Sequence, residues 1–240
     1  VTKTALITGG SKRLGQAMTT ALHRQGWNIA LHYGQSQAAA TSLAETLNAQ
    51  RPESVWCYQA DLSSDESLHA MLKKIETDYP CLDLVINNAA IFIPSVKGMT
   101  SSAEWDQTFA INLKAPFFIC QHLRSHLTEA SSIINICDVF GERPLKDFAA
   151  YSASKAGLIM LTRSLALDLA PKTRVNGIAP GAMLPPELEG ESDVLNHVLS
   201  QTPLGVLGGV SGLIKTLLFI LHQPYMTGQI IPVDGGLSIN

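Results

Sequence analysis

The sequence predicts a doubly wound α/β fold, with one seven-stranded, mostly parallel sheet flanked by helices, and three observations indicate it. Short β-rich segments alternate with longer helical patterns along the chain. The β-rich segments are apolar throughout rather than alternating, which is typical of strands that are covered on both faces. No linker, internal repeat or low-complexity tract interrupts the pattern. Right-handed crossovers between parallel strands place helices on both faces of the sheet. Since the pattern is uninterrupted, we expect a single layered domain over residues 1–240.

Local sequence justifies the elements in chain order. The first strand is the apolar run TALIT, and a glycine-rich turn opens the helix after it. The second helix is rich in Ala and Leu, and the third carries Leu68, Leu72 and Ile75 on one face. The expected strands are Thr4–Thr8, Asn28–Tyr33, Ser54–Gln59, Leu82–Asn87, Ser132–Cys137, Arg174–Ala179 and Gln229–Val233. The expected helices are Leu14–Gln25, Ala38–Gln50, Asp65–Tyr79, Glu104–Leu127, Ala149–Leu169 and Gly212–His222.

One segment, residues 181–209, departs from this regular alternation. It is rich in Pro and Gly, carries several acidic residues and follows the sixth strand. Ligands bind at the carboxyl ends of the strands in open α/β sheets. We therefore expect a substrate-side flap over that edge of the sheet.

Composition excludes several classes of protein. Hydrophobic residues make up 46% of the chain and charged residues 15%, which is typical of a folded globular domain. The net charge of −3 gives no basic surface for nucleic acid. The four cysteines have no CxxC spacing, so we expect no metal site. No run reaches the roughly 20 apolar residues that span a bilayer, and without a recognisable secretory leader we expect a cytoplasmic protein.

The turn after the first strand has the composition of a phosphate-binding loop. Thr8–Gly15 reads TGGSKRLG and opens the first helix, whose free N–H groups attract a pyrophosphate. Arg13 stands where a middle glycine is usual. The alternative is a purely structural turn, since many such turns need glycine.

The end of the second strand indicates which dinucleotide binds. An acidic side chain there would hold a ribose 2′-hydroxyl, but the sequence has His32, Tyr33 and Ser36 with no carboxylate. This favours NADPH over NADH, with Ser36, Gln35 and Arg13 near the 2′-phosphate. The alternative is a polar loop without a ligand. Asp61 could meet the adenine amine or could simply favour the helix N-terminus.

A tyrosine and a lysine form the candidate catalytic pair. Tyr151 and Lys155 are four residues apart in an expected helix, so they share one face. A nearby ammonium group lowers the pKa of a phenol, and a phenol tuned in this way can transfer a proton while a nicotinamide transfers hydride. The alternative is an exposed helical pair without chemistry.

Taken in order, these motifs resemble the short-chain dehydrogenase/reductase family over nearly the whole chain. The matching segments are TGGSKRLG (Thr8–Gly15), NNA (Asn87–Ala89), Asn112, YSASK (Tyr151–Lys155), PG (Pro180–Gly181) and VDGG (Val233–Gly236). The resemblance implies a Rossmann-type fold, an NAD(P)(H) cofactor and a homotetramer. It also implies that Asn112 kinks its helix and holds a water that links Lys155 to solvent.

The motifs and the resemblance together assign the site residues. Those expected to bind the cofactor are Gly9, Arg13, Leu14, His32, Tyr33, Ser36, Asp61, Leu62, Asn88, Ala89, Lys155, Pro180 and Gly181. Those expected to take part in catalysis are Asp138, Tyr151, Lys155 and Asn112.

Asp138 is the informative departure from the family, which usually has a serine thirteen residues before the tyrosine. A carboxylate there would repel the oxyanion that develops when a ketone is reduced. It suits a substrate that carries N–H groups or is protonated on nitrogen. The alternative is that Asp138 only caps a local turn.

This variant resembles the pteridine reductase subgroup, through SKRLG, His32, Tyr33 and Ser36, LNAQRPESV (Leu47–Val55), QADLS (Gln59–Ser63) and Phe92. The resemblance implies NADPH-dependent reduction of biopterin, dihydrobiopterin, dihydromonapterin or folates. It implies that Arg13, Phe92, Asp138 and Tyr151 bind the substrate, with Phe92 stacked on the pterin; the alternative is a core phenylalanine. Gly34 and Gln35 replace basic residues of the subgroup, which would weaken the preference for NADPH.

Two other functions stay open on the sequence. One is a carbonyl or 3-oxoacyl thioester reductase of the same family, against which Asp138 argues. The other is a non-catalytic nucleotide-binding regulator, against which the Tyr151–Lys155 pair argues.

Overall fold

Seven strands form one sheet in the computed structural model, which describes residues 2–94, 99–185 and 192–240. Their order is β3-β2-β1-β4-β5-β6-β7, and every adjacent pair is parallel. The doubly wound prediction is therefore confirmed, and within the described residues the sheet is wholly rather than mostly parallel. The strands are β1 (Thr4–Ile7), β2 (Asn28–Tyr33), β3 (Val55–Gln59), β4 (Leu82–Asn87), β5 (Leu127–Ile136), β6 (Thr173–Pro180) and β7 (Ile230–Val233).

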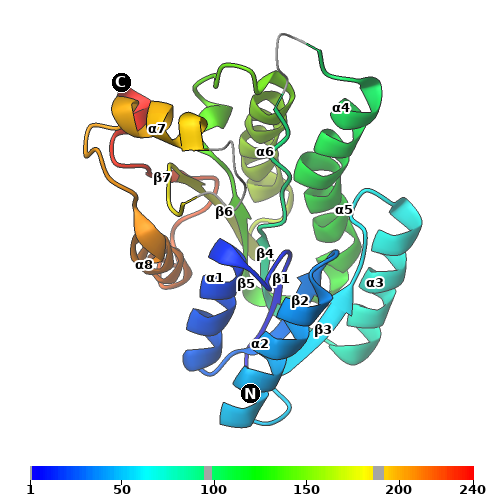
Figure 1. Ribbon diagram of the computed structural model, residues 1–240. Coiled ribbons are helices and arrows are strands. Elements are labelled where there is room, and N and C mark those ends of the chain that lie inside the picture. Colours follow the sequence, from blue (N-terminus) through cyan, green and yellow to red (C-terminus); the bar gives the residue numbers. More distant parts are fainter. Residues whose placement is uncertain (1, 95–98, 186–191) are drawn as a thin grey trace.

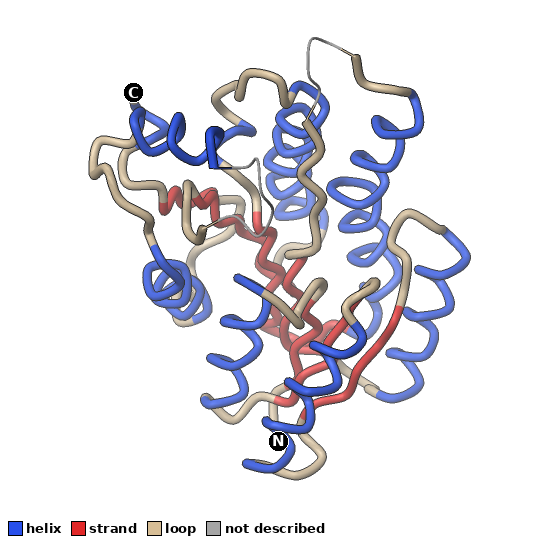
Figure 2. Tube along the Cα trace, viewed as in Figure 1, coloured by secondary structure: helices blue, strands red, loops and turns tan. Residues whose placement is uncertain are grey.

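Helices cover both faces of the sheet, as Figure 1 shows. One face carries α1 (Arg13–Arg24), α2 (Gln37–Gln50) and α8 (Gly209–Leu221), packed through side chains such as Leu22, Leu47 and Leu217. The other face carries α3 (Asp65–Asp78), α5 (Ala115–His122) and α6 (Ala149–Asp168), packed through Leu72, Ile119 and Leu165. The sheet is thus the middle layer of three, as the tube in Figure 2 also shows.

The predicted helix Glu104–Leu127 is a composite of several pieces. It contains α4 (Ser102–Phe109), a π-helical turn η2 (Ala110–Lys114), α5 and a 3₁₀ turn η3 (Leu123–His126). Strand β5 then begins at Leu127, five residues before the predicted Ser132. The early start was hidden because Thr128, Glu129 and Ser131 are polar, and the pairing register between β4 and β5 shifts in this region. A π-helical turn inserts one residue into the helix and commonly marks a functional site.

The predicted flap contains a helix that the sequence reading omitted. Residues 192–201 form α7 within the segment 181–209, and residues 186–191 lie outside the described part of the chain. Val198 on α7 is buried in a cluster with Phe148 and Tyr151. The Pro- and Gly-rich flanks concealed the helical spacing of Val194 and Val198. The flap therefore includes an ordered helix that rests on the cluster around Tyr151.

Candidate active site

Two adjoining cavities open at the carboxyl ends of the strands. The first, of about 900 Å³, lies over β1, β2 and β3. The second, of about 440 Å³, lies over β5 and β6 beside α7. Both are lined by Arg13, Leu14, Asn88, Ala90 and Ile91, so the two cavities form one continuous cleft. This is the edge of the sheet at which open α/β folds bind ligands.

The loop between β1 and α1 needs its glycines for close approach. Gly9 has a φ of +60°. A Cβ on Gly15 would lie 2.0 Å from the carbonyl oxygen of Gly9, so only glycine fits there. Arg13 has a φ of +50°, a left-handed conformation that explains why glycine is usual at this position. Its Nη1 donates a hydrogen bond to the carbonyl oxygen of Pro185 at 3.0 Å, so Arg13 connects the loop to the flap.

Neighbouring strands hold this loop through neutral hydrogen bonds. The Oγ1 of Thr8 accepts hydrogen bonds from the backbone N–H groups of Asn88 and Ala89, at 2.9 and 3.0 Å. The side-chain amide of Asn88 donates to the carbonyl oxygens of Thr8 and Gly9. His32, at the end of β2, accepts a hydrogen bond from the N–H of Gly9. The loop is therefore fixed before any ligand enters.

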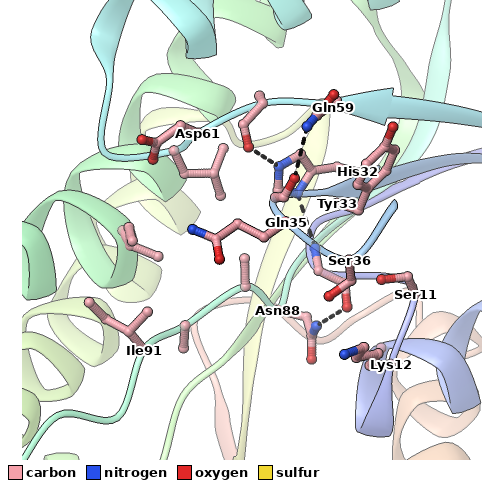
Figure 3. A pocket seen from close by; sticks show the side chains of 18 of the residues that line it. Ser11, Lys12, His32, Tyr33, Gln35, Ser36, Gln59, Asp61, Asn88 and Ile91 are labelled. Atoms are coloured by element: carbon pink, nitrogen blue, oxygen red, sulfur yellow. Dashed lines mark hydrogen bonds between the residues drawn. The ribbon is translucent and has the colours of Figure 1, made fainter. Parts of the chain in front are cut away.

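The first cavity is polar beside the end of β2, and β2 contributes no carboxylate to it. Figure 3 shows Ser11, Lys12, Gln35 and Ser36 around this cavity. Asp61 also lines it, and the Oδ1 of Asp61 accepts hydrogen bonds from the N–H and hydroxyl of Ser63. These bonds lower the pKa of Asp61, so it is a carboxylate at neutral pH.

Asp138 and Tyr151 are in direct contact in the second cavity. The Tyr151 hydroxyl donates a hydrogen bond to Oδ2 of Asp138 at 2.7 Å. The other oxygen, Oδ1, accepts from the N–H of Phe140 at 2.9 Å and caps a 3₁₀ turn, η4 (Val139–Gly141). One oxygen of Asp138 therefore caps a local turn and the other meets the tyrosine, so the cap does not exclude a role in catalysis, which stays a prediction.

Lys155 lies beside this pair but is bonded elsewhere. Its Nζ donates to the carbonyl oxygen of Ile136 at 2.8 Å and lies 5.7 Å from the centroid of the Tyr151 ring. Only 3% of Lys155 and 6% of Tyr151 are exposed, which excludes the alternative of an exposed helical pair.

The protonation states differ from the sequence expectation. Burial and the Asp138 carboxylate raise the pKa of Tyr151 well above its usual value. The lowering expected from Lys155 does not prevail, because burial and the facing Asp138 carboxylate both oppose phenolate formation. Burial raises the pKa of Asp138, although Lys155 opposes this, and burial lowers the pKa of Lys155. Asp138 is thus easier to protonate, and Tyr151 harder to ionise, than either group in water.

Phe92 is a surface ring rather than a core side chain. It is 40% exposed and lines the second cavity. Its ring stacks on Phe148, with centroids 4.1 Å apart and planes 16° apart, and meets Tyr151 edge to face at 4.7 Å. Phe148 itself is buried. Phe92 is therefore held as a flat apolar surface next to the Tyr151 ring.

Asn112 lies in the π-helical turn η2 and bonds to the segment that carries Phe92. Its Oδ1 accepts from the N–H of Ile91, and its Nδ2 donates to the carbonyl oxygen of Ile91 and to the Oγ of Ser154. It is buried and lines neither cavity. A water between Asn112 and Lys155 stays a prediction.

The remaining predicted residues fall around the same cleft. The first cavity is also lined by Gly9, His32, Tyr33, Leu62 and Ala89, and the second by Pro180 and Gly181. Sequence reading missed Lys12, Phe148 and the α7 side chains Val194, Leu195 and Val198. Phe148 could have been found from its position three residues before Tyr151, whereas α7 gave no motif. None of the described residues form a group of His, Cys, Asp or Glu able to hold a metal, and no described helix is long and apolar enough to cross a membrane.

Comparison with known families settles the class of protein. A family model described as enoyl-(acyl carrier protein) reductase matches residues 10–238. The chain belongs to the short-chain dehydrogenase/reductase family. It is therefore an oxidoreductase of that family, and the nicotinamide cofactor predicted from the glycine-rich loop is confirmed at that level.

Individual relatives point to two kinds of substrate. The chain is 32% identical to 3-oxoacyl-[acyl-carrier-protein] reductase FabG of Staphylococcus aureus strain Mu50, over 99% of this chain and 98% of the relative. It is 31% identical to pteridine reductase 1 of Leishmania tarentolae, over 98% of this chain and 96% of the relative. A crystal structure of FolM alternative dihydrofolate reductase 1 from Brucella canis, complexed with NADP, superposes with a TM-score of 0.88 at 30% identity, covering 99% of this chain and 95% of that one.

Proposed function

We propose that this protein is an NADPH-dependent reductase of pterins. The observation that carries the proposal is the hydrogen bond between Tyr151 and Asp138 inside the second cavity. A carboxyl group at this point disfavours an oxyanion and favours protonation of a nitrogen. Pteridine reductase 1 and FolM, two relatives named for pterin or folate chemistry, support the same substrate class.

The residues around the first cavity fit NADPH. The end of β2 offers Gln35 and Ser36 and no carboxylate, so a 2′-phosphate meets no like charge there. Lys12 lines the same cavity and supplies a positive charge. The Brucella canis structure, which contains NADP, supports this preference.

The raised pKa of Asp138 and its hydrogen bond to Tyr151 support a proton relay rather than a phenolate base. When bound, the nicotinamide supplies the hydride that reduces a ring carbon of the substrate. Tyr151 donates its proton to the adjacent ring nitrogen and receives one from a protonated Asp138, so the phenol is never left as an anion. Asp138 ends as a carboxylate, which Lys155 stabilises electrostatically, and regains its proton from solvent.

The rest of the second cavity fits a flat heteroaromatic ring. Phe92 presents a partly exposed apolar ring to the second cavity, and aromatic stacking on such a surface is favourable. Arg13 reaches both cavities and can meet substrate as well as cofactor. A homotetramer stays a prediction from the family resemblance, and a cytoplasmic location stays a prediction from the sequence.

The rate of NADPH oxidation by the purified protein, measured with NADPH in excess, tests the proposal directly. Biopterin, dihydrobiopterin, dihydromonapterin and dihydrofolate form one arm, and a 3-oxoacyl thioester with a panel of ketones forms the other. We expect turnover in the first arm and little in the second. The FabG relatives favour the opposite result, a 3-oxoacyl reductase, and turnover restricted to the thioester would establish that alternative. Tight NADPH binding without turnover in either arm would indicate the non-catalytic regulator.

A further inference from the structure

The peptide groups of Gly9 are held from both neighbouring strands. Strand β1 lies between β2 and β4 in the sheet, and the loop that follows β1 passes between their ends. The carbonyl oxygen of Gly9 accepts a hydrogen bond from Asn88, after β4, at 3.1 Å. The N–H of Gly9 donates to Nδ1 of His32, in β2, at 3.1 Å. His32 is therefore one of two clamps on the residue that begins the dinucleotide loop.

The partners of His32 determine which of its nitrogens carries the proton. The N–H of Gly9 can only donate, so Nδ1 must present a lone pair. The other nitrogen, Nε2, lies 3.1 Å from the carbonyl oxygen of Ala60, which can only accept, so Nε2 must carry the hydrogen. His32 is 2% exposed, and neither ring nitrogen is left to bind a ligand. The imidazole is thus a neutral bridge from the loop after β1 to the end of β3.

We propose that His32 is a positioning residue for the dinucleotide: its Nδ1 lone pair fixes the direction of the Gly9 peptide and so shapes the loop that receives the pyrophosphate. This inference rests on the NADPH cofactor of the proposed function. It changes the role expected from the sequence, in which His32 touches the cofactor itself. Without an acceptor at Nδ1, the partly buried N–H of Gly9 loses its partner in the protein, and nothing fixes the direction of that peptide on the β2 side.

Two substitutions separate the two hydrogen bonds of His32. An asparagine side chain places its oxygen near the position of Nδ1, and a glutamine side chain places its amide near the position of Nε2. His32→Asn therefore keeps the bond to Gly9 and loses the one to Ala60, whereas His32→Gln does the reverse. We expect the Kd for NADPH, measured by nucleotide fluorescence, to stay within about twofold in His32→Asn and to rise about five- to tenfold in His32→Gln, the size of one hydrogen bond.

The melting temperature supplies the readout that separates positioning from stability. Each variant loses one hydrogen bond of His32, so both should melt at a lower temperature, while only His32→Gln should bind NADPH weakly. The matched controls are His23→Asn and His23→Gln, at a buried histidine whose Nε2 contacts Ser54 away from both cavities. These should lower the melting temperature and leave the Kd unchanged.

Equal Kd values in the two His32 variants, or a rise that also occurs in the His23 variants, would overturn the inference. Binding of NADPH that follows the expected pattern, in a protein that reduces no pterin, would support the role of His32 and contradict only the proposed substrate. Failure of the unmodified protein to bind NADPH would overturn both.

Discussion

The two halves of the cleft contain different kinds of polar group. The dinucleotide half is the first cavity with the loop after β1, and the catalytic half is the second cavity. In the dinucleotide half, neutral groups pair with one another: Gly9 with His32, and Thr8 with Asn88. In the catalytic half, three ionisable groups, Asp138, Tyr151 and Lys155, are gathered around one cavity. A neutral, fully paired network has one stable arrangement, whereas buried ionisable groups shift each other's pKa. The first half therefore suits the binding of a ligand, and under the proposed function the second half suits the transfer of a proton.

The largest effect should come from removing the proton donor. In Tyr151→Phe, turnover of dihydrobiopterin should fall by about 10³-fold or more, within the range known for general acids and bases. The Kd for NADPH should stay within about twofold, because Tyr151 lines only the second cavity. Steady-state kinetics and nucleotide fluorescence measure the two quantities. A variant that keeps its turnover would remove Tyr151 from the mechanism.

Lowering the pH should destabilise the dinucleotide half through His32. Burial lowers the pKa of His32 from 6.5 to about 4, so the unfolded chain binds its proton first as the pH falls. The free energy of unfolding should therefore decrease from pH 6.5 down to about pH 4 and lose ~3 kcal/mol from this group. Urea titrations across this range measure the slope. His32→Asn, which cannot titrate, should lose this part of the slope, and an unchanged slope in that variant would refute the assignment.

Replacing the acid by the usual alcohol should weaken the chemistry more moderately. In Asp138→Ser, pterin turnover should fall by about 10- to 100-fold, because Tyr151 loses its proton source. Ketone or 3-oxoacyl reduction should rise, since the repulsion of an oxyanion is gone. Asp138→Asn is the control that keeps the shape of the side chain and removes its charge. Unchanged pterin reduction in both variants would leave Asp138 with only its cap on Phe140.

The smallest effect should come from replacing Phe148, whose ring stacks on Phe92. In Phe148→Leu, the KM for dihydrobiopterin should rise about three- to tenfold with kcat little changed, because an aromatic pair contributes ~1 kcal/mol beyond its buried area. Phe148→Tyr should restore the KM. Leu145→Ala, in the same buried cluster, should lower stability without this change in KM. A KM that follows the melting temperature in all three variants would argue against a role in substrate binding.

The sheet could be predicted well from sequence because its strands are apolar and evenly spaced. The bounds of β2 and β4 agree with the prediction, and those of β5 do not, because three of the residues 128–131 in its first half are polar. The helix α7 escaped detection because glycines and prolines surround it. Burial by helices leaves a strong sequence signal, whereas a short helix in a flap does not.

Which residues line the candidate site could be predicted from the sequence, but their hydrogen-bond partners could not. The motifs brought Asp138, Tyr151 and Lys155 to one cavity, but the direction of the Tyr151 pKa depends on its burial and on its bond to Asp138. The same holds for His32, whose two partners come from segments 23 and 28 residues away. Partners of this kind depend on tertiary packing, which no local pattern contains.

The left-handed backbone at Arg13 has a consequence for engineering this chain. An arginine in that conformation costs about 1–2 kcal/mol relative to a relaxed backbone, and glycine would remove the cost. A library screened for thermal tolerance alone should therefore enrich Arg13→Gly. The same library screened for turnover should be depleted of Arg13→Gly, because this variant lacks the guanidinium group that joins the nucleotide loop to Pro185.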